Sequence, residues 1–169
     1  MWEMGLEAMN GEAPEVVIGE LLEQRGLTLA VAESCTGGLI SHRITNVPGS
    51  SAYYEGGVVS YSNEAKARLL HVKPDTLDRY GAVSEQVAGE MAWGVRHLFH
   101  TDVGLAVTGI AGPGGGTPEK PVGLVYVALV IWEGEWVEQR VWDGDRQENK
   151  ARSAEAALDL LRLYLEGRL

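Results

Sequence analysis

The segment from Thr28 to Val47 places the pattern of a strand directly before the pattern of a helix. Thr28–Ala32 is a short run of β-branched and small apolar residues, which is typical of a buried strand. Apolar residues then recur at helical spacing from Leu39 to Val47. Residues 33–38 are therefore predicted to form a strand-to-helix junction, around which the rest of the chain is expected to be organised.

Helical and strand patterns alternate along the remaining sequence. Helices are predicted at residues 13–25, 39–45, 64–71, 74–81, 84–98 and 146–165, and further strands at residues 53–61, 103–108, 123–132 and 136–142. The last two strands are expected to form a hairpin that turns at Glu133–Glu135. The alternation predicts an α/β fold, a three-layer α/β/α sandwich with a mixed, mostly parallel sheet and a late antiparallel hairpin.

Length and composition narrow the class of protein. The 169 residues are expected to form an irregular lead-in at residues 1–12 and a single domain at residues 13–169. A net charge of -10 argues against nucleic acid as a partner. No run is apolar enough to span a membrane, and the start lacks a basic region followed by an apolar one, so we expect a cytoplasmic protein. The sequence contains one cysteine and four histidines, and these residues do not have the spacing of metal ligands. We therefore expect no metal and no cofactor.

Two predicted strands end in glycine-containing loops, after Ala32 and after Thr108. In open α/β sheets ligands bind outside the carboxyl ends of the strands, so a pocket is expected between these loops. Ser34 would lie at its mouth. The first amides of the following helix, left open by Gly37 and Gly38, would form an oxyanion or anion site. The alternative is that Ser34 or Thr36 only caps the helix.

Lys66 falls in the first turn of a predicted helix, where a cation opposes the helix dipole. The dipole and partial burial would lower the pKa of Lys66, as a general base requires, and a serine hydroxyl needs such a base. Tyr61, at a strand end, could relay or orient the proton, or stack on a substrate ring. The alternatives are a solvated surface lysine and a tyrosine that packs on the sheet.

The loop after Thr108 matches neither the P-loop nor the dinucleotide fingerprint, although its glycines permit a nest of backbone amides. Arg146 offers five donors for a phosphate or carboxylate. It could equally pair with Asp143 or Asp145.

Several motifs resemble one family. The stretches AESCTGG, GSSAYYEGGVVSYSNEAK, GAVSEQVA and VTGIAGPGGGTPEKPVG, in this order and spacing, are similar to the C-terminal domain of the competence/damage-inducible protein CinA. This domain also occurs alone as a bacterial nicotinamide-nucleotide amidohydrolase. The resemblance covers about Leu27 to Arg146. Full CinA proteins carry a nucleotide-binding domain before this one. The given sequence does not include it, so we expect either a stand-alone enzyme or a piece cut from a longer protein, and the initial Met favours the former.

The resemblance implies a hydrolase that converts nicotinamide mononucleotide (NMN) to nicotinic acid mononucleotide and ammonia, in pyridine nucleotide (NAD) salvage. Its catalytic residues would be Ser34 as nucleophile, Lys66 as base and Tyr61 in the site. Thr108 and Gly109 would lie near the reacting group, with Thr36, Gly37 and Gly38 around the oxyanion. Arg146 would bind the substrate phosphate. The resemblance also implies a homodimer and no cofactor.

Two other interpretations remain open. In the first, Cys35 is the nucleophile and His42 its base, since a helix N-terminus can lower a thiol pKa; His42, however, lies about two turns further along the helix. In the second, the chain is a non-catalytic nucleotide-binding or protein-interaction module linked to competence or the DNA damage response.

Overall fold

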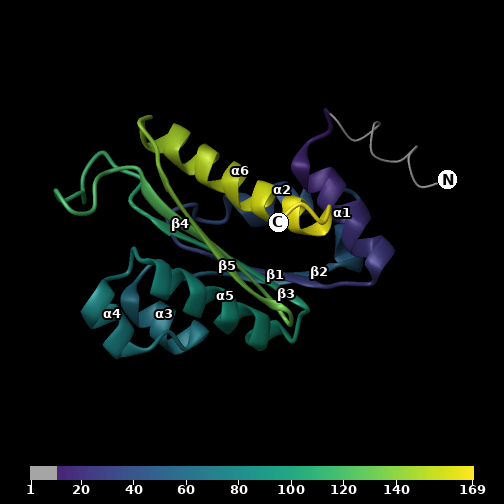
Figure 1. The fold of residues 1–169 in the computed structure, drawn as a ribbon, viewed down its shortest axis with the longest axis horizontal. Helices are drawn as coiled ribbons and strands as arrows, with labels where there is room; N and C mark the ends of the chain where they lie inside the picture. Colours follow the sequence, from purple (N-terminus) through teal and green to yellow (C-terminus); the bar gives the residue numbers. More distant parts are fainter. Residues whose placement is uncertain (1–10) are drawn as a thin grey trace.

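The computed structural model describes residues 11–169 and contains one five-stranded sheet between two layers of helices. On one face lie α1 (Pro14–Arg25), α2 (Leu39–Thr45) and α6 (Arg146–Leu165); on the other lie α3 (Asn63–Leu70), α4 (Pro74–Tyr80) and α5 (Glu85–Phe99) (Figure 1). A short 3-10 turn, Ser50–Ala52, precedes the second strand. The predicted three-layer α/β/α sandwich is confirmed.

The sheet has the strand order β2-β1-β3-β4-β5. Its strands are β1 (Leu29–Glu33), β2 (Tyr54–Val59), β3 (Val103–Gly109), β4 (Leu124–Ile131) and β5 (Gly134–Val141). Strand β1 is parallel to its two neighbours, β2 and β3, whereas β4 is antiparallel to both of its neighbours. Four strands therefore run in one direction and β4 in the other, as expected for a mixed sheet with a late hairpin.

Residues of β1 and β3 alternate between two hydrophobic cores. Leu29 and Val31 pack toward α1, α2 and α6, whereas Ala30 and Ala32 pack toward α5. Small residues on the α5 side let the helix approach the sheet closely. A Cβ at Gly104 would lie 2.2 Å from the Ala92 carbonyl oxygen, so this contact requires glycine.

Paired strands bring the two predicted loops together. Glu33 pairs with Val107 at the carboxyl ends of β1 and β3, and the Ser34 amide donates to the Val107 carbonyl oxygen at 3.0 Å. Ser34 and Thr108 thus leave neighbouring strands at the same edge of the sheet, where the pocket was expected.

The structure shifts some predicted boundaries. Ile131 pairs with Gly134, so the hairpin turns at residues 132–133 and not at Glu133–Glu135. The strand expected to end at Ala32 continues to Glu33. Of the lead-in expected at residues 1–12, residues 1–10 lie outside the described part of the chain. Between residues 11 and 169, the structure contains no helix of the length and apolarity that crossing a membrane requires.

Candidate active site

Ser34 is the first residue after β1 and is almost fully buried, with 8% of its surface exposed. The chain then turns through Gly37 and Gly38, whose positive φ angles of 62° and 102° favour glycine. Because Ser34 follows β1 directly and its amide is bonded to β3, the sheet fixes the position of its backbone.

Glu33, which the sequence analysis missed, organises this turn. Its carboxylate is 1% exposed and accepts hydrogen bonds from the hydroxyls of Thr36 (2.6 Å) and Ser41 (2.9 Å). It also accepts the amides of Gly38 (3.0 Å), Ile40 (3.2 Å) and Ser41 (2.9 Å). Glu33 therefore caps the N-terminus of α2, whose positive end stabilises the buried carboxylate. An acidic residue shortly before a predicted helix was the available signal.

These bonds bear on the roles expected for Thr36, Gly37 and Gly38. The Gly38 amide is bonded to Glu33, and the Gly37 amide donates to the Ser34 carbonyl oxygen at 3.1 Å. None of the three residues lines the cavity described below. Within residues 11–169, only the Cys35 and Thr36 amides of this turn have no protein acceptor. The alternative that Ser34 or Thr36 caps α2 is also wrong, because Glu33 takes that role.

Lys66 contacts Ser34, which lies 32 residues earlier in the sequence. Its Nζ donates to Ser34 Oγ at 2.9 Å and to the Ser60 carbonyl oxygen at 2.5 Å. Lys66 lies in the first turn of α3, where the Ser62 side chain accepts the Ala65 amide as N-cap. The Ser60 carbonyl holds one N–H of Lys66, which orients the amine toward the serine.

The Lys66 side chain is 1% exposed, so it is a buried lysine and not a solvated one. Burial penalises the charged ammonium and lowers the pKa of Lys66 to about 8. A lysine with this pKa carries a substantial neutral fraction near physiological pH, which a general base requires. The predicted pairing of a serine with a lysine of lowered pKa is thus present in the geometry.

Tyr61 and Arg146 form a pair at the rim of the site. Arg146 donates from Nη2 to the Tyr61 hydroxyl at 2.9 Å and from Nη1 to the Gly112 carbonyl oxygen at 2.6 Å. Tyr61 is 62% exposed. Its hydroxyl is joined to Arg146 and makes no hydrogen bond with Lys66 or Ser34 in the described structure, so the expected proton relay is not present in this geometry.

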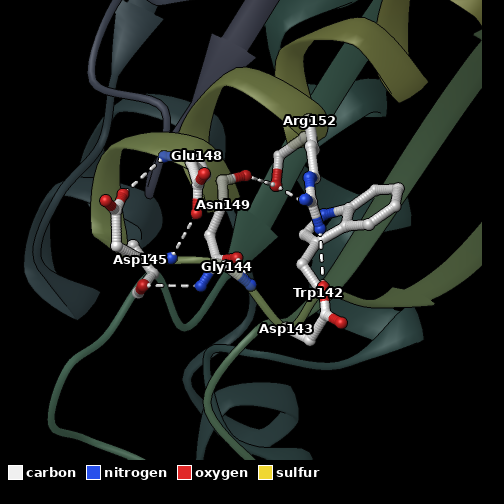
Figure 2. A network of polar contacts seen from close by, with 9 residues as sticks. Trp142, Asp143, Gly144, Asp145, Glu148, Asn149 and Arg152 are labelled. Carbon is white, nitrogen blue, oxygen red and sulfur yellow. Dashed lines mark hydrogen bonds and ion pairs between the residues drawn. The ribbon is translucent and has the colours of Figure 1, made fainter.

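A network of polar contacts that includes Asp145, Glu148 and Asn149 organises the start of α6 (Figure 2), and Arg146 is the first residue of this helix. Asp145 and Glu148 form a reciprocal capping box, and Asn149 accepts the Gly144 amide at 3.0 Å. The buried Asn149 also donates to the Ala111 carbonyl oxygen at 3.0 Å, which ties α6 to the glycine-rich loop. Because Asp145 serves as cap and Asp143 pairs with Arg152, Arg146 does not pair with these aspartates.

Thr108 and Gly109 end β3 and line the cavity described below. The Thr108 hydroxyl donates to the Ala82 carbonyl oxygen at 2.8 Å. Thr108 therefore holds the segment between α4 and α5 against the sheet. At Gly109 a Cβ would lie 2.8 Å from the Leu124 carbonyl oxygen, so the close approach of β4 requires glycine there.

A cavity of about 290 Å³ opens over the serine and lysine. It is lined by Ser34, Cys35, Tyr61, Asn63, Lys66, Ala82, Val83, residues 108–112, Gly114, Gly115 and Arg146. The buried serine–lysine pair thus lies on one side of the cavity and Arg146 on its rim. Such a cavity suits a small molecule that carries an electrophilic carbon at one end and an anionic or polar group at the other.

The structure argues against Cys35 as nucleophile. Burial raises the pKa of its thiol to about 12, so the thiolate is scarce at neutral pH. His42, its proposed base, is exposed on α2 and contacts Asn46 at 3.3 Å. Within the described range, no group of three or more His, Cys, Asp or Glu side chains is arranged to hold a metal ion.

Known proteins are similar to this chain in sequence and in fold. The family described as the CinA C-terminal domain matches residues 12–165. A competence-damage inducible protein from Caldanaerobacter subterraneus subsp. tengcongensis is 53% identical over 161 residues, which is 95% of this chain but 39% of the relative. The chain thus spans about two fifths of the length of this curated relative.

Two solved structures have the same fold over nearly their whole length. The Klebsiella pneumoniae 700603 protein of the CinA superfamily aligns with a TM-score of 0.88 and 32% identity, covering 91% of this chain and 96% of that one. A competence/damage-inducible protein from Agrobacterium tumefaciens aligns with a TM-score of 0.85 and 40% identity, covering 92% and 96%. The chain belongs to the family of the CinA C-terminal domain.

Proposed function

We propose that the protein hydrolyses the carboxamide of nicotinamide mononucleotide to nicotinic acid mononucleotide and ammonia, with Ser34 as nucleophile and Lys66 as its base. The observation that carries the proposal is the 2.9 Å contact between Lys66 Nζ and Ser34 Oγ, made by a buried lysine whose pKa is lowered to about 8. The resemblance to the nicotinamide-nucleotide amidohydrolases supplies the substrate, and the size of the cavity is compatible with it.

In the first half-reaction, Ser34 Oγ attacks the amide carbon while neutral Lys66 takes the hydroxyl proton. The Cys35 amide, which has no protein acceptor in residues 11–169 and belongs to a residue that lines the cavity, is the donor in this turn for the developing oxyanion. Lys66 then gives its proton to the departing nitrogen, and ammonia leaves as the C–N bond breaks.

The second half-reaction returns the enzyme to its starting state. Lys66 takes a proton from water, whose oxygen attacks the ester carbon, and Ser34 leaves with the proton that Lys66 returns. The sum is one amide and one water converted to one carboxylic acid and one ammonia. Arg146 would bind the substrate phosphate at the rim, because a guanidinium offers paired donors to phosphate oxygens.

Incubation of the purified chain with NMN tests this proposal. We expect ammonia and nicotinic acid mononucleotide in equal amounts. Release of free nicotinamide would instead indicate cleavage of the glycosidic bond, and the absence of any product would favour a non-catalytic module. Either result would contradict the proposed reaction.

A further inference from the structure

One wall of the cavity is held by an unusual set of side-chain contacts. The wall is the segment Tyr80–Val83, which joins α4 to α5 and contributes Ala82 and Val83 to the cavity lining. Each of its four consecutive carbonyl oxygens accepts a hydrogen bond from a side chain. The donors are Lys120 to Tyr80, Ser84 to Gly81 at 2.9 Å, Thr108 to Ala82 at 2.8 Å and Lys120 to Val83 at 2.8 Å.

Lys120 differs from the other two donors in its origin. Ser84 is the N-cap of α5 and Thr108 belongs to β3, so both are part of the scaffold. Lys120 comes from the loop at residues 110–123, which forms another part of the cavity lining through Ile110–Gly112, Gly114 and Gly115. It is therefore the donor through which the glycine-rich loop is tied directly to the wall.

The loop presents Lys120 through a local turn. The Thr117 amide donates to the Lys120 carbonyl oxygen at 2.7 Å, and the Lys120 amide donates to the Thr117 hydroxyl at 3.0 Å. The ammonium then reaches the carbonyl at the C-terminus of α4, where the helix dipole favours a cation. No carboxylate within residues 11–169 forms an ion pair with Lys120. Its charge is thus directed to the carbonyls of the wall.

We propose that Lys120 is a positioning residue that sets the width of the reaction cavity by fixing the glycine-rich loop at residues 110–123 to the wall at Tyr80–Val83. The serine and lysine of the site are anchored elsewhere, directly after β1 and in α3, and neither contacts Lys120. Loss of the contact would therefore weaken substrate binding and leave the chemical step largely intact. The kinetic part of the inference rests on the proposed amidase function.

Steady-state kinetics with NMN test this role. In Lys120→Met the apolar stem remains and the donors are lost, so we expect KM to rise about tenfold with kcat within about threefold of wild type. Lys120→Arg keeps donors and charge and should give an intermediate KM. The matched control is Lys73→Met, whose side chain is 76% exposed and outside the cavity, with unchanged kinetics expected.

The kinetic proposal is overturned if KM in Lys120→Met stays at the wild-type value, whether or not kcat falls. It is equally overturned if Lys120→Arg and Lys120→Met raise KM to the same extent, because donors and charge would then not matter. A melting temperature for each variant separates loss of folded protein, which lowers apparent kcat alone, from a change in the cavity.

Hydrogen–deuterium exchange gives a second readout that needs no substrate. We expect faster amide exchange in Lys120→Met than in wild type for peptides that cover residues 80–84 and 110–122, with no change in α6. Unchanged exchange in both segments would overturn the proposed contact. A wild-type chain that releases no ammonia from NMN would refute the proposed function, and exchange would still decide whether Lys120 holds the two segments together.

Discussion

At the scale of single residues, the protein carries a lysine where solvent cannot stabilise its charge. Lys66 is 1% exposed and bonded to Ser34 and to the Ser60 carbonyl oxygen. Full desolvation of a lysine is costly, and strongly perturbed pKa values are concentrated at functional sites. The contact with Ser34 places a hydroxyl, from which a proton can be taken, beside this amine of lowered pKa.

The first prediction concerns activity as a function of pH. Since Lys66 must be neutral to take the Ser34 proton, and its pKa is lowered to about 8, kcat/KM for NMN should rise with pH, reach about half of its plateau near pH 8 and level off above about pH 9. The measurement is kcat/KM from pH 6 to pH 10, with Lys73→Met as a control that keeps the profile. A rate independent of pH across this range would speak against a titrating lysine base.

The second prediction concerns stability. The folded pKa of about 8 lies below the ordinary value of 10.5, so between these pH values the unfolded chain binds more protons than the folded chain. The free energy of unfolding of the wild type should therefore rise across this window. Relative to Lys66→Met, the gain should approach roughly 3 kcal/mol. Urea unfolding of both proteins at several pH values measures it, and parallel pH curves would show that Lys66 titrates normally.

Part of the site follows from the sequence and part does not. Ser34, Lys66 and Arg146 lie near the ends of predicted strands and helices, where the sequence pattern marks them as candidate site residues. Glu33 was missed because its role depends on five donors that come together only when α2 folds back over the end of β1. The amides of Gly37 and Gly38 were assigned to substrate because no local pattern shows that other groups already occupy them.

At the scale of elements, the junction between β1 and α2 is the feature that places the nucleophile. Glu33 accepts the first amides of α2 and the hydroxyls of Thr36 and Ser41, so strand and helix are locked around Ser34. On the other face of the sheet, α3 follows β2 and carries Lys66 in its first turn. Two strand-to-helix junctions on neighbouring parallel strands thus bring the serine and the lysine together.

The third prediction tests the first junction. Glu33→Gln keeps the shape of the side chain but replaces one acceptor oxygen by the NH2 group of an amide. This group would face the hydroxyl and amide donors that Glu33 now accepts. We expect the free energy of unfolding to fall by about 2–3 kcal/mol, measured by urea unfolding. The control is Glu64→Gln in the first turn of α3, where the side chain is 83% exposed and the change should stay within about 0.5 kcal/mol. Equal stabilities of the two variants would contradict the capping role.

At the scale of the whole molecule, the alternation of periodicities was enough to predict the layers and the late hairpin. Helices bury one face and central strands bury both, so the two patterns differ even in a single sequence. Boundaries were less exact, as at the hairpin, where Gly134 pairs with Ile131. The hydrogen bonds from Lys120 to the wall at Tyr80–Val83 were not predictable, since they join two segments whose proximity depends on the complete fold.

The central claim is that Ser34 is the nucleophile and Lys66 its base, and the most direct test is the rate of ammonia release from NMN by matched variants. We expect Ser34→Ala and Lys66→Met each to lose at least ~1,000-fold in kcat/KM while remaining folded by circular dichroism. The control Ser51→Ala, at an exposed serine outside the cavity, should match the wild type. Retention of more than about a tenth of the wild-type activity in Ser34→Ala would contradict the account, because a water-only mechanism cannot reach that rate without the serine.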